Sequence, residues 1–456
     1  MNTDQRLAAF VADLRWRNIP SALAHKVHDH VLDTLGVMCA GISAPASAAV
    51  RAMAMDAGGN REASVIGAAK ALPAANAAFV NAFHGRIHTF DDTYEAGPIH
   101  AGSVILAAAL ATAERRRASG SDLLAAVLAG YEVAVRVADA LGPDHYAAGF
   151  HGTGTCNVLG AAAAAARALG LDARGVAGAL GHAGGSAAGL RQYQDSGSMS
   201  DSALNGARAA QAGVTAALLS AGGLFGPDDI LSGRWGVCRV LSAGPDLTRL
   251  DSGLGRDWVF RATALKPYPT CRFTHGPIAA LLDLRRRHDI DPDRVEQIVI
   301  SAFRQSIEVS DRARVESRFD ALMSHQFGAA VALAKGRVGM DSLEPPIRTN
   351  PVVRGLMGKV RIQHDPSLDA AYPARWPHRV EVRLSDGRML NAESRNPPGD
   401  TDAPLGPEVL VAKFRDLAEP VLGKVGAERL RGEISNLGET ADVNALGPLL
   451  RGDTVT

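Results

Sequence analysis

Cysteine is scarce in this chain of 456 residues, and the four present lie far apart with no CxxC pair: Cys39, Cys156, Cys238 and Cys271. Zinc sites and disulfide frameworks need closely spaced cysteines, so neither is expected. Isolated reduced thiols instead favour a cytoplasmic protein.

Neither sign of charge is in excess, because Lys plus Arg and Asp plus Glu each total 48. Nothing therefore indicates nucleic acid or an anionic membrane as a partner. An anionic substrate would be held by a few local cations rather than by a global field.

Long hydrophobic runs are also missing. The first 17 residues are mixed and charged, which excludes a signal peptide. The Ala-rich stretches are interrupted before about 18 residues, so no membrane span is expected. Two domains are the default expectation for a chain of this length. From the missing hydrophobic runs and the isolated thiols, we predict a soluble cytoplasmic protein.

Ala, Leu and Gly dominate the first half in segments of helical length. Lys26 to Ala40 places apolar residues on one face, and Ser103 to Arg117 is almost entirely apolar. Further helices are predicted from a cap at Ser121 to about Leu141, at Thr155 to Leu169 and at Ala203 to Leu219. Ala-rich helices with little polar surface are buried helices, which predicts a large all-α domain.

The pattern changes after about residue 262. Short β-branched or alternating segments occur at 297–302, 358–364 and 379–384, and the last is followed by a turn at 385–388 and a return at 389–393. Helical patterns lie between them, and helices resume after Pro407. These features predict a mainly α protein: an all-α domain over 1–262 and 400–456, and an inserted α+β lid with an antiparallel sheet over 263–399.

Candidate chemistry first appears in Asn81 to His100 (NAFHGRIHTFDDTYEAGPIH), which holds three histidines and two adjacent aspartates. His84 and His88, with Asp91 or Asp92, could bind a metal, but the set lacks an HExxH glutamate. We favour the interpretation that the two aspartates cap a helix or turn and orient a histidine. His100 stands just before an apolar helix, a position that suits carboxylate binding or acid–base chemistry.

Two further clusters follow. The stretch 149–155 (GFHGTGT) is a Gly-rich loop that opens onto a helix and contains His151, a candidate base or anion ligand. It is not GxGxxG and follows no strand, so a dinucleotide fold is rejected. The stretch 265–275 (LKPYPTCRFTH) concentrates groups capable of proton transfer or anion binding where the helical domain would give way to the lid.

These clusters, in this order, resemble the MmgE/PrpD family, which includes 2-methylcitrate dehydratase, cis-aconitate decarboxylase and iminodisuccinate epimerase. The matching stretches are LDTLG from Leu32, NAFHGRIHTFDDT, GFHGTGT, ARAAQAG from Ala207, and KPYPTCRFTH. The resemblance implies a helical domain with an α+β lid, usually as a homodimer, with a site between the domains and without a cofactor or metal. It implies that Thr93, His100, His151 and Lys266 line that site.

Some positions depart from the family pattern. Thr89 stands where the DFDDT motif has an acid, and the region 200–205 has neither the Lys nor the His that members often carry there. Cys271 and Phe327 stand near positions where decarboxylase-like members have His and Tyr. These differences argue against 2-methylcitrate dehydration and cis-aconitate decarboxylation as the specific reaction.

The family's reactions share a step that leaves carbanion-like charge beside a carboxylate. Fixed cations must stabilise this charge, and a base with a pKa near neutrality must accept the proton. We therefore predict a dehydratase-like lyase acting on a small di- or tricarboxylic acid. An epimerase of a dicarboxylic amino or imino acid, and a non-catalytic carboxylate-binding protein, are the alternatives. The predicted catalytic residues are His100, His151, Lys266 and Tyr268, and the predicted substrate-binding residues are Thr93, Asp91, Arg272, Cys271 and His275.

Overall fold

The computed structural model describes residues 1–452, which form two compact units. The first comprises Met1–Leu265 with the chain from Gly406 onward, and the second comprises Lys266–Leu405. The predicted class, a mainly α fold with a smaller α+β region, is confirmed. Among residues 1–452, no single helix meets the length and hydropathy of a membrane span, although the sharply bent pair Ser21–Gly41 and Pro45–Asp56 meets them together.

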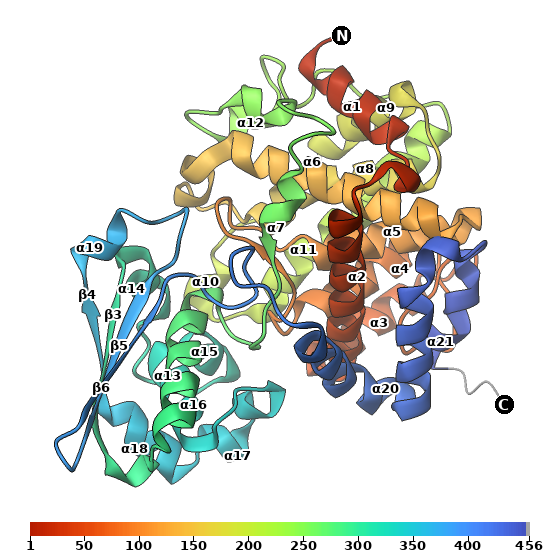
Figure 1. The fold of residues 1–456 in the computed structure, drawn as a ribbon. Coiled ribbons are helices and arrows are strands. Elements are labelled where there is room, and N and C mark those ends of the chain that lie inside the picture. Colours follow the sequence, from red (N-terminus) through yellow and green to blue (C-terminus); the bar gives the residue numbers. More distant parts are fainter. Residues whose placement is uncertain (453–456) are drawn as a thin grey trace. The chain divides into compact units, whose positions relative to one another are not determined.

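The first unit is helical because its Ala-rich segments allow close helix packing. Helix α8 packs against neighbours that include α5, α6, α9 and α11 (Figure 1), and a Cβ on Gly130 of α6 would lie 2.9 Å from the Gly160 carbonyl oxygen of α8. The helices are α1 Thr3–Asp13, α2 Ser21–Gly41, α3 Pro45–Asp56, α4 Ala74–Arg86, α5 Gly102–Arg116, α6 Gly120–Ala147, α7 Gly152–Thr155, α8 Asn157–Ala168, α9 Ala173–Gly184, α10 Tyr193–Ser196, α11 Met199–Ala221, α12 Val237–Leu241, α20 Pro407–Ser435 and α21 Gly447–Arg451.

Three details correct the sequence-based boundaries in this unit. The cap of α6 is Ser119, whose side chain accepts from the Asp122 amide, and not Ser121. The helix predicted over 155–169 is α8, which begins two residues later, at Asn157, after the short helix α7. The unit also holds a two-stranded antiparallel ladder, in which β1 Thr93–Tyr94 pairs with β2 Thr263–Ala264.

The second unit is a four-stranded sheet in the order β4-β3-β5-β6, with helices packed on it (Figure 1). Alternate residues of β5 are buried, so one face of the sheet meets the core. The strands are β3 Val295–Ala302, β4 Val360–His364, β5 His378–Leu384 and β6 Met389–Ser394, and the helices are α13 His275–His288, α14 Arg304–Ser310, α15 Arg318–Met323, α16 His325–Lys335, α17 Pro345–Arg348, α18 Pro351–Lys359 and α19 Pro366–Asp369.

The predicted hairpin is present, since β5 and β6 pair antiparallel around a turn with Gly387 at φ 84°. The sheet as a whole is mixed rather than purely antiparallel, because β4 runs parallel to β3. A parallel neighbour is possible here because the long helical connection from β3 to β4 lets the chain return in the same direction.

Candidate active site

The loop between α4 and α5 is organised by Asp92. Its carboxylate accepts a hydrogen bond from the Gly102 amide at 2.7 Å, which caps α5, and another from the Tyr131 hydroxyl at 2.7 Å. Burial, and next the neighbouring Asp91, raise the pKa of Asp92 to about 7, while the two hydrogen bonds oppose this rise. The expectation that an aspartate here caps a helix is confirmed. The start of α5 therefore already holds a carboxylate of the chain itself.

Asp92 also orients His100 through its backbone. The Nδ1 atom of His100 lies 2.8 Å from the Asp92 carbonyl oxygen. A carbonyl oxygen can only accept, so Nδ1 carries the hydrogen, and Nε2 is the basic nitrogen of the neutral ring. The His100 side chain keeps 17% of its surface exposed, so this base is not sealed inside the protein.

The Asp91 carboxylate also lies near His100. It lies 3.8 Å from Nδ1 of His100, and it accepts hydrogen bonds from Arg86 and Ser103, both at 3.0 Å. The residue is fully buried, and each oxygen already has a donor. Asp91 therefore pairs with Arg86 and lies where its charge would stabilise a protonated His100, and its contact with substrate stays a prediction.

His151 is positioned by the Gly-rich loop at the start of α7. Its backbone amide donates to the Gly189 carbonyl at 3.0 Å, and a Cβ on Gly154 would lie 2.2 Å from the Ala188 carbonyl oxygen. Only glycine permits this close approach. The His151 ring is 2% exposed and packs against Tyr193, with ring centroids 4.9 Å apart.

Asn205 of α11 sets the tautomer of His151. The Asn205 Nδ2 group lies 3.0 Å from Nδ1 of His151 and also donates to the Leu190 carbonyl at 3.3 Å. Nδ1 therefore accepts, and Nε2 carries the hydrogen. Burial, followed by the charges of Arg86 and Arg191, lowers the pKa of His151 well below its usual value. At neutral pH, His151 is an uncharged hydrogen-bond donor rather than a ready base.

Direct contacts bring the two histidine segments together. The His100 amide donates to the Thr153 hydroxyl at 3.2 Å, and the His100 carbonyl accepts from the Asn157 side chain at 2.6 Å. A Cβ on Gly152 would clash with Ile99 at 2.7 Å. The segments that carry His100 and His151 are therefore in contact within the first unit.

The neighbours of this pair bear on the other predictions. Thr93 is 4% exposed and belongs to β1. Thr89 has φ 56°, a strained conformation for a β-branched residue. His84 faces Arg51 and His88 faces the Ala40 carbonyl. Within residues 1–452, no three His, Cys, Asp or Glu side chains are placed to share a metal ion, so the metal interpretation has no ligand set there.

The third cluster lies in the second unit. Lys266 is fully buried, and the Tyr268 ring packs edge-on against His275 with centroids 5.2 Å apart. Burial raises the pKa of Tyr268 to about 12, and Arg272 opposes this rise. Tyr268 therefore stays protonated at neutral pH and can act as a donor.

Arg272 and His275, which the sequence predicts to bind substrate, make contacts within the second unit. Arg272 donates to the carbonyls of Pro398 at 2.7 Å and Pro397 at 3.2 Å. His275 lies 3.2 Å from the Thr270 carbonyl and is fully buried. Cys271 packs against an aromatic core cluster. These contacts stabilise the segment, and substrate binding by Arg272, His275 and Cys271 stays a prediction.

Sequence reasoning missed the roles of Arg86, Asn205 and Tyr131, whose side chains pair with Asp91, His151 and Asp92. It also missed a buried network in the second unit. Ser306 Oγ lies 2.9 Å from Nε2 of His325 and 3.0 Å from Nε2 of His378. Only Arg86 had a sequence signal, since it lies five residues before Asp91 in the same cluster.

Comparison with known proteins places this geometry in a family. The MmgE/PrpD N-terminal domain matches residues 5–250, and the MmgE/PrpD C-terminal domain matches residues 268–439. The chain belongs to the MmgE/PrpD family. The predicted recognition is thus confirmed, and both halves of the family architecture are present.

Several MmgE/PrpD relatives are similar along almost their whole length. The cis-aconitate decarboxylase-like protein oryM of Aspergillus oryzae is 26% identical, covering 99% of this chain and 98% of that protein. Mouse cis-aconitate decarboxylase is also 26% identical, covering 99% and 94%. The human protein of the same name is 28% identical, covering 84% and 80%. Decarboxylases are lyases, so these names support a lyase-type activity for the family.

Proposed function

We propose that this chain is a lyase that forms or quenches carbanion-like charge beside a carboxylate of a small di- or tricarboxylic acid. The observation that carries the proposal is the state of His100. Its Nδ1–H is held by the Asp92 carbonyl with the Asp91 carboxylate behind it, and its Nε2 is basic on a partly exposed ring. This is the arrangement that a proton-transfer histidine requires.

His151 supplies a complementary group. Because its Nδ1 accepts from Asn205, its Nε2–H can donate to a carboxylate oxygen on which negative charge develops. The Arg86 guanidinium is close enough to depress the pKa of His151 and adds positive potential at the same place. The pair therefore combines a base with a stabiliser of the charge that the base creates.

The remaining roles are proposals from the motif. Lys266 is buried. We assign Lys266 to binding a substrate carboxylate, and Tyr268 to donating a hydrogen bond or proton.

The relatives' names favour decarboxylation of a cis-aconitate-like acid, in which the electron pair left by departing CO₂ takes a proton from His100. Dehydration, the reaction class favoured from sequence, uses His100 in the opposite sense, to remove the proton before hydroxide leaves. An epimerase remains a second candidate, because a base and a donor side by side also suit removal and return of one proton. Each reaction requires the same histidine.

The test is to incubate the full-length protein in D₂O with cis-aconitate, 2-methylcitrate and iminodisuccinate and to follow the products by NMR. CO₂ release, water loss and inversion with deuterium uptake identify the three reactions. We expect His100→Asn, whose amide can still donate to the Asp92 carbonyl, to lower the rate by about 10²–10⁴-fold.

His182→Gln is the matched control, since His182 lies on α9 and its Nε2 contacts the Leu224 carbonyl away from the site. Binding without product or deuterium exchange would instead identify a carboxylate-binding protein. Full activity in the His100 variant would remove His100 from the mechanism.

A further inference from the structure

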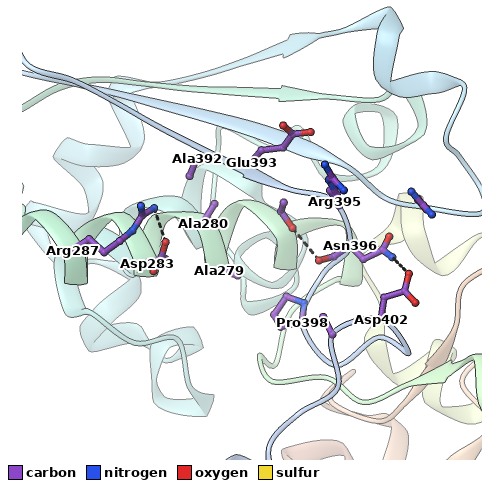
Figure 2. Close-up of a pocket in the computed structure, with 13 residues that line it drawn as sticks. Ala279, Ala280, Asp283, Arg287, Ala392, Glu393, Arg395, Asn396, Pro398 and Asp402 are labelled. Atoms are coloured by element: carbon purple, nitrogen blue, oxygen red, sulfur yellow. Dashed lines mark hydrogen bonds and ion pairs between the residues drawn. The ribbon is translucent and has the colours of Figure 1, made fainter.

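The second unit contains a pocket that the proposed reaction does not use. It has a volume of about 580 Å³ and lies between α13, the edge strand β6 and the segment that follows β6 (Figure 2). That volume is within the range of small-molecule sites. Alanines and a proline form much of its wall, namely Ala279, Ala280, Ala392, Ala403 and Pro398, so the pocket offers apolar contact between its charged groups.

The two ends of the pocket differ in charge. At one end, Arg287 is paired with Asp283 at 2.6 Å, which neutralises it (Figure 2). Toward the other end lie Arg395, Asn396 and Asp402. Asp402 accepts a hydrogen bond from the Asn396 amide at 3.3 Å.

Arg375 and Arg395 are two further cationic residues of the pocket wall. Both line the pocket and are exposed, and neither makes a side-chain hydrogen bond or ion pair within residues 1–452. Each arginine immediately precedes one member of a hydrogen-bonded pair. Trp376, which follows Arg375, donates its backbone amide to the side chain of Asn396, which follows Arg395, at 3.4 Å.

Acceptors line the same end. The Glu393 and Asp402 carboxylates both border the pocket. An anion that also bears hydroxyl or amino groups could therefore pair with the arginines and donate hydrogen bonds to these carboxylates. The segment is also tied to the third sequence cluster, since Arg272 donates to the carbonyls of Pro397 and Pro398. A bound ligand would therefore stabilise the backbone segment to which Arg272 donates.

We propose that this pocket is a second ligand site, which binds a small organic oxyanion carrying hydrogen-bond donors. Arg375 and Arg395 bind the oxyanion, and Glu393 and Asp402 accept from its hydroxyl or amino groups. The inference is independent of the proposed reaction, because none of these residues belongs to the His100–His151 site.

The experiment titrates the full chain with citrate, tricarballylate and inorganic phosphate at constant ionic strength, by calorimetry and by thermal shift. Citrate and tricarballylate carry the same three carboxylates but differ in one hydroxyl. We expect saturable citrate binding that raises the melting temperature, weaker binding of tricarballylate, and an affinity loss of about tenfold for each arginine removed. Phosphate binding as tight as that of citrate would identify a phosphate ester as the natural ligand class.

The variant is Arg375→Gln with Arg395→Gln, and the matched control is Arg383→Gln with Arg388→Gln. The control removes the same charge from exposed arginines of the hairpin that already pair with Glu296 and Asp386. Retained citrate affinity in the first double variant, as expected if citrate bound only at the histidines, would overturn the proposal. Equal losses in both variants, equal affinity for citrate and tricarballylate, or no saturable binding of any probe would overturn it too.

Discussion

The opposite assignments of the two histidines can be tested at Asn205. Replacing Asn205 by Asp keeps the shape of the side chain but turns the donor facing Nδ1 of His151 into an acceptor. The ring then gains by placing its hydrogen on Nδ1, so that Nε2 loses its hydrogen. We expect the Nε2–H tautomer of the natural protein to become Nδ1–H in the variant.

The expected loss of activity follows from the loss of the hydrogen-bond donor at Nε2. Removing one donor aimed at developing charge typically lowers kcat by about 10²–10³-fold. Replacing Asn205 by Leu instead leaves Nδ1 buried without its donor, at a cost of about 1–3 kcal/mol. The carboxylate variant should also raise the pKa of His151 from its depressed value, because a neighbouring negative charge favours imidazolium.

The assay is ¹⁵N NMR of histidine-labelled protein, in which protonated and bare ring nitrogens have well-separated shifts, together with the pH profile of the D₂O reaction. Gln211→Glu is the control, since it makes the same chemical change on the same helix but faces Asn76. An unchanged His151 tautomer in Asn205→Asp, with wild-type activity, would refute the reasoning.

The remaining predictions concern the buried network of the second unit. Because Nδ1 of His378 must donate to the Trp376 carbonyl, Ser306 donates to His378 and accepts from His325. Ser306→Ala should therefore lower the free energy of unfolding, measured by urea titration, by about 2–4 kcal/mol. Ser310→Ala is the control and should be nearly neutral, because Ser310 lies on the same helix but its hydroxyl has no partner within residues 1–452. Equal effects would exclude the network. Burial lowers the pKa of His325 to about 4 and, with repulsion from His325 second, that of His378 to about 3, so the unfolded chain takes up protons first and stability should fall as pH drops from about 6.5 toward 4; His378→Asn should reduce the slope near pH 5 by about 1 kcal/mol per pH unit, and an unchanged slope would contradict the assignment.

Helical periodicity and turn residues predicted most of the fold. One of the helical patterns between the predicted strands corresponds to α13 at His275–His288, and the turn at 385–388 joins β5 to β6. The helices predicted after Pro407 are present in α20, which consists of two helices that meet at a kink at Gly423 with φ 69°. Local signals failed where a tertiary feature decides. Alternation in 358–364 marks a strand but does not specify its neighbour, so the parallel pairing of β4 could not be read from it.

The candidate site was predicted as far as residue chemistry allows. Histidines beside aspartates and glycines stand out in a sequence, and the segments of His100 and His151 are in contact. Asn205 lies 54 positions from His151 and is an ordinary helical residue by every local criterion. No spacing rule connects it to the ring that it controls, because the connection exists only once α11 has packed.

The role of each imidazole is decided by the atom opposite its Nδ1. A carbonyl oxygen faces His100, so the hydrogen sits on Nδ1 and the outward nitrogen is basic. An amide NH₂ faces His151, so the outward nitrogen carries the hydrogen. Nearby charge favours the same division, because the Asp91 carboxylate lies beside His100 while Arg86 and Arg191 depress the pKa of His151. Two residues of one type thus become a base and a donor, and exchanging their Nδ1 partners should exchange their roles.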